Sequence, residues 1–401
     1  MRWIQAEEGQ SPLDALQLDI VGFLAILGEG SVLANAQVST LSKWIFLPRL
    51  IPAPQALMRP TRPLKLEPVA GQVAGIYSGN YRDSINHIGH IVCDASNLPE
   101  HSVRVVEIKR VDRDKDLKSR TVAPLTFVLL IGFFLSCLLL GISLWRQDGM
   151  SIVATCLLSF LSSLIGAGNK WTLQLPKRKN KTGTVPRGDV VIRYPKGSFL
   201  VVRCEEDVAR ELYFAPEIIK YLLQHGPAYR ILSLVGTMML MGGVICLANA
   251  QIEQQIAWAA SYMLLGSLYW IVAALPSKLH WDYSCYEVVN ECLSDSDITK
   301  KGYPSESQTF TQALWRAIVV TKKTEWVLKS NACPDTDAWQ EWLRAAREVA
   351  KDVGVADVPK LPGVKTWHVP EEWNPQDYLN DVLKQQAEKD SKRMNENIQE
   401  V

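Results

Sequence analysis

The sequence predicts an α-helical integral membrane protein with four transmembrane helices and a mixed α/β cytosolic region. The first observation is an uncharged run over residues 122–145, which at about 1.5 Å per residue can cross a hydrocarbon core of roughly 30 Å. A polar turn at 146–149 leads into a second uncharged run, residues 150–168. The second observation is that residues 231–250 and 256–276 repeat this pattern. The sequence therefore predicts two transmembrane hairpins.

Composition limits the classes of partner. The 401-residue chain has a net charge of +1, so no overall positive field indicates nucleic-acid binding. Its eight cysteines show neither the spacing of a disulfide framework nor that of a zinc site, and free thiols fit a reducing cytosol. We therefore expect the lipid bilayer as a partner, with a further protein partner or self-association through the spans, and no nucleic acid.

Residues 1–121 are predicted to form a cytosolic N-terminal region. Apolar positions from Leu13 to Leu27 suit a buried or amphipathic helix, and residues 36–50 are expected to form a second helix. Acidic residues precede the apolar run, where a signal peptide needs positive charge, so we expect no cleaved signal. Prolines between residues 52 and 63 predict a linker or extended arm over 51–65.

Three strand-like runs follow this arm, at residues 73–77, 90–93 and 103–109. The last of them alternates and is rich in β-branched residues, as a half-buried strand should be. Residues 109–120 are dense in charge and predict a solvated segment directly before the first span.

The central loop, residues 169–230, predicts the orientation of the whole chain. Its first third is rich in lysine and arginine from Lys170 to Arg187, and basic loops stay on the cytoplasmic side. The two turns between paired spans are short and nearly neutral. We therefore expect both termini and the central loop in the cytoplasm, and both turns on the other side. The glycosylation pattern at Asn180 should then remain unused.

A β-hairpin is predicted at residues 188–204, with strands at 190–194 and 199–202 and a Pro195-Lys196-Gly197 turn. These strands are apolar at nearly every position, which is typical of strands covered on both faces. A lone hairpin is marginal in water, so we expect one shared sheet with residues 103–109. Helices at 208–214 and 339–349 are the expected covers, and a further short helix is predicted at 217–224.

The stretch GDVVIRYPKGSFLVVRCEEDVARELYFAPE resembles a group of fungal multi-span integral membrane proteins of unassigned function. The resemblance covers this loop and the pattern of spans, about half of the chain. It implies a fungal source and a membrane location. The group offers no catalytic residues to transfer to this sequence.

After the fourth span the sequence predicts helices at 282–294, at 310–328 and from Pro334 onward, followed by a polar segment at 376–397 that is either helical or disordered. The predicted domain boundaries are 1–121 for the N-terminal region, 122–168 for transmembrane hairpin 1, 169–230 for the cytosolic loop, 231–276 for transmembrane hairpin 2, 277–358 for the cytosolic helical region and 359–401 for the polar tail.

One cluster has metal-ligand residue types. His87, His90 and Cys93 are three residues apart in succession and, with Asp94, contain the donors that zinc uses. Gly89 and its β-branched neighbours favour a strand, on which His87 and His90 would point to opposite faces. A structural role is therefore the favoured hypothesis, and these three residues remain weak candidates for a metal site. We expect no cofactor.

The spans themselves bear on function because they contain no charged residue. Ion pathways and proton relays usually place ionisable groups at membrane depth. Ser162 and Gly166 instead form a small-xxx-small pair that favours close helix packing. No catalytic signature identifies a reaction. The leading hypothesis is a membrane-anchored scaffold or accessory protein with a cytosolic docking face. The alternatives are an oligomeric channel or transporter, and a membrane-bound enzyme with a cytosolic site.

Overall fold

The structure is a computed structural model. It describes residues 29–95, 98–112, 115, 117–175, 183–291, 293, 305–357, 365–370 and 372–399. The helix expected around Leu13–Leu27 and the pattern at Asn180 lie outside these residues. The chain divides into two compact units that alternate along the sequence. The helical unit comprises Met1–Lys65, Leu117–Gln174 and Ile218–Tyr283, and the sheet unit comprises Leu66–Asp116, Leu175–Glu217 and Ser284–Val401.

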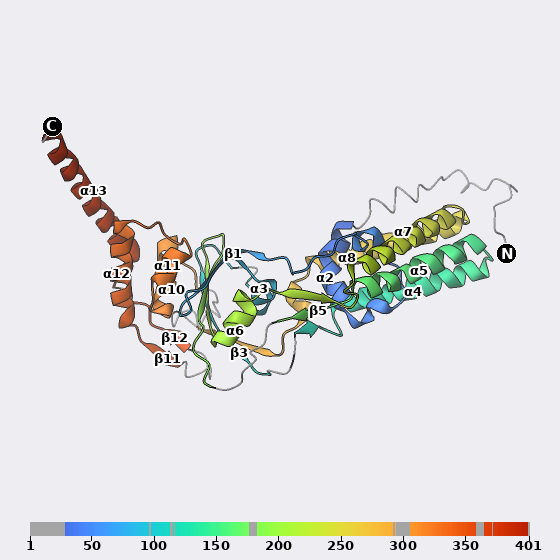
Figure 1. Cartoon of the computed structure of the whole chain (residues 1–401), viewed down its shortest axis with the longest axis horizontal. Helices are drawn as coiled ribbons and strands as arrows, with labels where there is room; N and C mark the ends of the chain where they lie inside the picture. Colours follow the sequence, from blue (N-terminus) through green and yellow to red (C-terminus); the bar gives the residue numbers. More distant parts are fainter. Residues whose placement is uncertain are drawn as a thin grey trace. The chain divides into compact units, whose positions relative to one another are not determined.

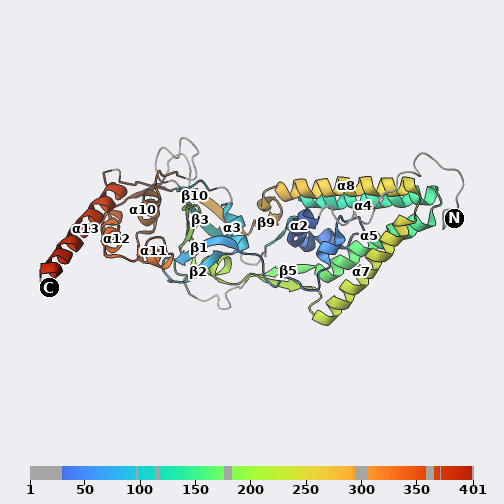
Figure 2. The same ribbon diagram turned by 90° about the horizontal axis from the view of Figure 1, so that it is seen from above.

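The helical unit contains the four predicted apolar helices, and each is long and apolar enough to cross a membrane. Helices α4 and α5 form one hairpin, and α7 and α8 form the other. Helices from different hairpins also pack together in space: α5 packs on α7, and α4 packs on α8 (Figures 1 and 2). Their bounds are Pro124–Trp145 for α4, Gly149–Asn169 for α5, Gly226–Ala248 for α7 and Ile252–Ala274 for α8.

The N-terminal segment of this unit lies between the two helix pairs (Figure 2). It consists of α2 (Glu29–Leu41) and two 3₁₀ turns, η1 (Lys43–Phe46) and η2 (Pro54–Leu57). The continuous helix expected over 36–50 is wrong. The Ser42 hydroxyl accepts a hydrogen bond from Trp44 N and starts a new turn, and Pro48 cannot continue a helix.

Two short antiparallel ladders complete the helical unit. Strand β5 (Trp171–Gln174) pairs with β8 (Ile218–Tyr221), and β4 (Lys118–Ser119) pairs with β9 (Trp281–Asp282). The helix predicted at 217–224 is therefore wrong. Residues 218–221 alternate between exposed and less exposed positions, and this period of two matches a strand with one covered face.

The sheet unit is built on a six-stranded sheet with the order β10-β3-β7-β6-β1-β2. Strands β3 and β7 run parallel, and the other neighbours run antiparallel. The predicted shared sheet is confirmed, because Val201 on β7 pairs with Val105 on one side and with Val191 on the other. The strand bounds are Val69–Gly75 for β1, Tyr81–Ile85 for β2, Val103–Arg110 for β3, Val190–Arg193 for β6, Phe199–Arg203 for β7 and Tyr286–Glu291 for β10.

Helices cover both faces of this sheet, which explains why its central strands are apolar throughout (Figure 1). On one face α10 packs on β3 and β7, and α12 packs behind α10. On the other face lie α3 and α6, the latter continued by one π-helical turn, η3. The helix bounds are His87–Cys93 for α3, Glu206–Ala209 for α6, Arg210–Phe214 for η3, Phe310–Thr321 for α10, Glu325–Lys329 for α11, Asp337–Lys351 for α12 and Pro375–Gln399 for α13.

Two sequence-based expectations in this unit are wrong. The segment predicted as a helix at 282–294 instead contains strand β10, because residues 286–291 find a complete antiparallel partner in β3. The strand predicted at 90–93 is instead the end of helix α3. Its buried residues Ile88, Ile91 and Val92 have helical spacing. Gly89 permits this packing, since a Cβ there would lie 2.6 Å from Tyr213 Cε1.

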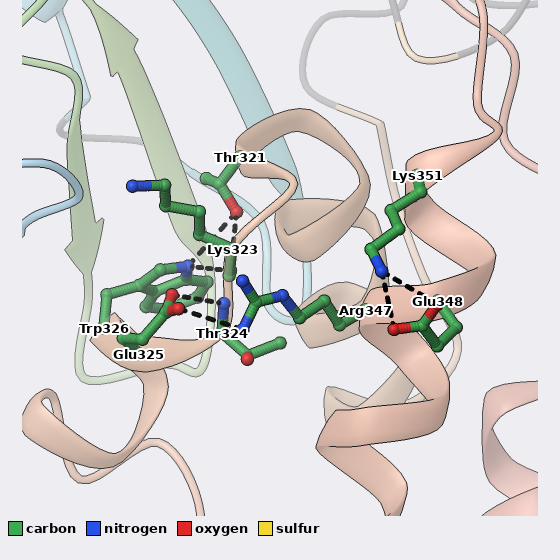
Figure 3. Close-up of polar contacts among 8 residues, drawn as sticks. All are labelled: Thr321, Lys323, Thr324, Glu325, Trp326, Arg347, Glu348 and Lys351. Atoms are coloured by element: carbon green, nitrogen blue, oxygen red, sulfur yellow. Dashed lines mark hydrogen bonds and ion pairs between the residues drawn. The ribbon is translucent and has the colours of Figure 1, made fainter.

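The helical layer is fixed by polar contacts at the turn between α10 and α11 (Figure 3). Trp326 Nε1 donates to Thr321 Oγ1 at 3.1 Å and to Lys323 O at 2.8 Å. Glu325 forms an ion pair with Arg347 of α12 at 3.1 Å. These contacts tie α10, α11 and α12 into one layer. The remaining ladder, β11 (Val355–Asp357) with β12 (Lys365–Trp367), follows α12.

Candidate functional site

The buried polar cluster around α3 holds the predicted site residues. Glu217 is 4% exposed and accepts backbone hydrogen bonds from His87 N at 2.9 Å and Ile88 N at 2.7 Å. The carboxylate thus satisfies two amide groups that a helix leaves free at its first turn. Burial raises the pKa of Glu217 to about 7, against the opposing effect of those two hydrogen bonds and of Arg82.

Neighbouring side chains fix the same corner of the sheet unit. Arg82 donates to Asn86 Oδ1 at 2.6 Å and to Tyr213 O at 3.1 Å. Asn86 Nδ2 donates in turn to Ala215 O at 2.8 Å. The segment before Glu217 is therefore bound to the start of α3 by the side chains of Arg82 on β2 and of Asn86, the residue directly before α3.

His87, His90 and Cys93 lie on this one helix but bond to different groups. His90 Nδ1 is 3.0 Å from the Tyr194 hydroxyl, and Cys93 Sγ is 3.1 Å from the Tyr213 hydroxyl. Within the described residues, no group of three or more His, Cys, Asp or Glu side chains is placed to hold a metal ion. The favoured structural role of these residues stays a prediction.

The electrostatics of the cluster oppose nucleophilic chemistry at Cys93. Burial raises the pKa of its thiol to about 11, and the residue is fully enclosed. The reactive thiolate form is therefore scarce at neutral pH. Burial lowers the pKa of His87 to about 4, with a further contribution from His90, and it also lowers the pKa of His90. Both imidazoles are neutral at pH 7.

The helical unit has a polar seam, which we define as Ser136 and Ser143 on α4 with Ser151, Ser159 and Ser162 on α5. The hydroxyls of Ser136 and Ser159 are 2.5 Å apart, and those of Ser143 and Ser151 are 2.7 Å apart. All five residues are buried. Small residues that share hydrogen bonds allow two apolar helices to approach closely. The seam therefore has the character of a packing contact.

The N-terminal segment places a buried charged residue, Arg49, in the helical unit. Arg49 is 2% exposed, and its Nη1 donates to the carbonyls of Ile45 at 3.0 Å and Leu47 at 3.1 Å. The adjacent Leu50 N donates to Gly132 O at 3.2 Å. Gly132 lies about 12 Å along α4 from its first residue. The sequence of the spans contains no sign of Arg49, since only the fold brings the N-terminal segment between the long helices.

Asp148 contacts both of the turns that join paired helices, the one between α4 and α5 and the one between α7 and α8. Its Oδ1 accepts from Met150 N at 3.1 Å and from Ser151 N at 3.2 Å, which begins α5. Its Oδ2 accepts from Gln251 N, in the turn between α7 and α8, at 2.8 Å. An exposed ion pair between Arg146 and Glu253, at 2.9 Å, links the same two turns.

One hollow among these helices is lined in part by Met58, Asn169, Tyr229, Ser233 and Gly236. Its volume is about 10 Å³, close to the room that a single water molecule needs. This hollow is too small for a solute.

Comparison of the chain with protein-family models, curated proteins and solved structures found no match. The resemblance to fungal multi-span membrane proteins therefore stays a prediction.

Proposed function

We propose that this protein is an integral membrane scaffold or accessory protein, which crosses the bilayer four times and presents the sheet unit in the cytosol. Four long apolar helices support the membrane location. One hairpin turn joins α4 to α5 and another joins α7 to α8, so the sheet-unit segments all leave from one end of the bundle.

The charge at the two ends of the helical unit supports the orientation. The end that joins the sheet unit is strongly basic, and its described acidic residues are Glu29 and Asp282. The turn end carries Arg146, Asp148 and Glu253. Positive charge beside spans favours the cytoplasmic side. The basic residues of the first end are Lys43, Arg59, Arg62, Lys65, Lys118, Arg120, Lys170, Lys220, Arg230 and Lys278.

The observation that carries the scaffold proposal is the construction of the sheet unit. Its sheet takes strands from before α4, from between α5 and α7, and from after α8. The unit is therefore tethered to the membrane helices at several places and cannot separate from them. Its last helix, α13, runs beyond the helices on which its first turns pack (Figure 1). Residues 384–392 of this helix are mostly polar and exposed, and they offer a surface for a protein partner.

The alternative of a channel or transporter has less support. The hydroxyls of the polar seam bond to each other or to backbone carbonyls, and Arg49 is bound by carbonyls of its own segment. Groups satisfied in this way hold helices together. A membrane-bound enzyme is disfavoured by the enclosed Cys93 and the neutral His87.

Topology can be tested with single introduced cysteines in sealed microsomes and a membrane-impermeant maleimide. Lys65→Cys should be labelled in sealed vesicles, whereas Arg146→Cys should be labelled only after detergent is added. The reverse pattern would show an inverted protein. Labelling of both sites in sealed vesicles would exclude membrane crossing.

The scaffold assignment is tested by reconstituting the purified full chain in liposomes and measuring ion and small-solute flux. We expect flux equal to that of protein-free liposomes. Removal of residues 384–401 should leave membrane insertion intact and abolish cross-linking to cytosolic proteins in cells. Flux above the background, or cross-links that survive the truncation, would contradict the proposal.

A further inference from the structure

The β5–β8 ladder has one buried face and one exposed face. Trp171, Leu173 and Ile219 are buried, at 2%, 9% and 6% exposure. On the exposed face, Ile218 is 51% exposed and Leu222, which directly follows β8, is 68% exposed. Large aliphatic side chains in a two-residue period on an open face are unusual for a surface in water.

Basic side chains stand beside these aliphatic ones. Lys220 lies between Ile218 and Leu222 on the same face and pairs across the ladder with Thr172. Lys65 is the antiparallel bridge partner of Ile218 and therefore lies beside it on this face. Both lysines are exposed. We call the four residues Lys65, Ile218, Lys220 and Leu222 the interfacial patch.

The patch is held rigidly at the ends of two long helices. Leu222 N donates to Lys170 O at 2.8 Å, one residue after the end of α5. The Arg62 guanidinium lies between the rings of Tyr221 and Tyr229, at 4.0 Å and 3.9 Å from their centroids. Tyr229 belongs to the first turn of α7, so the patch is fixed at the level where the apolar helices end.

We infer that the interfacial patch lies on the cytosolic leaflet, with its aliphatic side chains at the boundary of the acyl chains and its two lysines on anionic lipid headgroups. The occupant is a bilayer surface for two reasons. The patch is continuous with helices that reach the same surface, and aliphatic residues interleaved with lysine match an acyl boundary beneath negative phosphates. This inference rests on the proposed membrane insertion.

The test uses the full chain in nanodiscs of phosphatidylcholine and phosphatidylserine, with a photo-crosslinking amino acid at one position at a time. Position 222 probes the patch, position 238 probes the exposed middle of α7, and position 196 probes a solvent-exposed turn of the sheet unit. We expect lipid adducts at 222 and 238 and none at 196. Adducts at 238 alone would overturn the patch while leaving membrane insertion standing. Absence of adducts at both positions would overturn both.

A protein adduct at position 222, from a second copy or another chain, would also overturn the inference. The charge component is tested by Lys65→Gln combined with Lys220→Gln. The ratio of phosphatidylserine to phosphatidylcholine adducts at 222 should fall about fivefold for each lysine, the factor that about 1 kcal/mol per basic residue near an anionic surface implies. The matched control, Lys384→Gln with Lys389→Gln on α13, removes the same charge and should leave the ratio unchanged. An equal ratio in the patch variant would contradict headgroup binding.

Discussion

Single side chains from distant parts of the chain complete the ends of several helices. Glu217 caps the first turn of α3 across 130 residues of sequence. Lys170 Nζ donates to Leu41 O at 2.5 Å and to Ser42 O at 2.9 Å, at the C-terminal end of α2. A positive charge is favourable at that end, and α2 has no basic residue of its own in its last turn.

At the residue scale, Glu217 should make stability depend on pH. Its folded pKa of about 7 lies above the ordinary value of 4.5, so its stabilising contribution is complete below pH 4.5 and is lost as the pH rises through 7. A shift of this size corresponds to about 3 kcal/mol of unfolding free energy. The difference in stability between wild type and Glu217→Gln should therefore decrease by about that amount between pH 4.5 and pH 7. Thermal unfolding in detergent at a series of pH values measures it.

His87 should make stability depend on pH in the opposite direction, over nearly the same pH range. Its pKa is lowered from 6.5 to about 4, so its contribution is present above pH 6.5 and is lost as the pH falls through 4. His87→Gln is therefore the matched control, with a difference profile of opposite slope. If the difference in stability between wild type and Glu217→Gln did not change with pH, the raised pKa of a buried Glu217 carboxyl group would be contradicted.

These contacts could not be predicted from the sequence. The short spacing of His87, His90 and Cys93 suggested a candidate site, whereas Glu217 and Tyr213 are remote in sequence and meet α3 only through the fold. Glu217 even lay at the start of a segment predicted to be helical. A local sequence pattern contains no information about a partner more than a hundred residues away.

At the element scale, the two hairpins of the helical unit are joined by one carboxylate. Asp148 begins α5 and also binds the backbone of the turn between α7 and α8. The exposed Arg146–Glu253 ion pair joins the same turns, but exposed pairs contribute little. The buried contact should therefore dominate the coupling of the hairpins.

Asp148→Ala should lower the unfolding free energy by about 1–2 kcal/mol, the usual effect of losing an N-cap. Glu253→Gln, which removes only the exposed pair, should change it by less than about 0.5 kcal/mol. Thermal denaturation in detergent, monitored by tryptophan fluorescence, provides the comparison. Equal effects of the two variants would show that Asp148 does not couple the turns.

The elements predicted correctly are those with long or complete patterns. The four apolar helices and the hairpin at 190–202 needed no distant partner to be recognised. The errors at residues 217–224 and 282–294 concern short segments, in which helix and strand periods are hard to separate. Pairing with β5 and with β3 decided their conformation, and that pairing is a tertiary property.

At the scale of the whole molecule, the sheet unit depends on all three of its segments. Strand β7 lies between β3, from before the first long helix, and β6, from its own loop. Val201 is 1% exposed at the centre of this arrangement. The sheet cannot be assembled from the central loop alone.

Val201→Asp should destabilise the sheet unit by several kcal/mol, because it buries an unpaired carboxylate. Limited proteolysis should then cut residues 66–116 and 183–217 together. Lys196→Asp, in the exposed turn of the same hairpin, should leave the cleavage pattern unchanged. A dispersed NMR spectrum from residues 169–230 expressed alone would contradict the dependence on the other segments.

The distribution of strands along the chain has a consequence for biosynthesis. Strand β3 emerges from the ribosome well before β10, its antiparallel neighbour, and before α10, which covers it. At 5–20 residues per second the delay is on the order of ten seconds or more. During this time the nascent chain has unpaired strand edges, and on the proposed membrane insertion these edges lie beside the translocation machinery. A chain terminated directly after α8 would retain those edges permanently, so such truncations should become substrates of chaperones and membrane quality control.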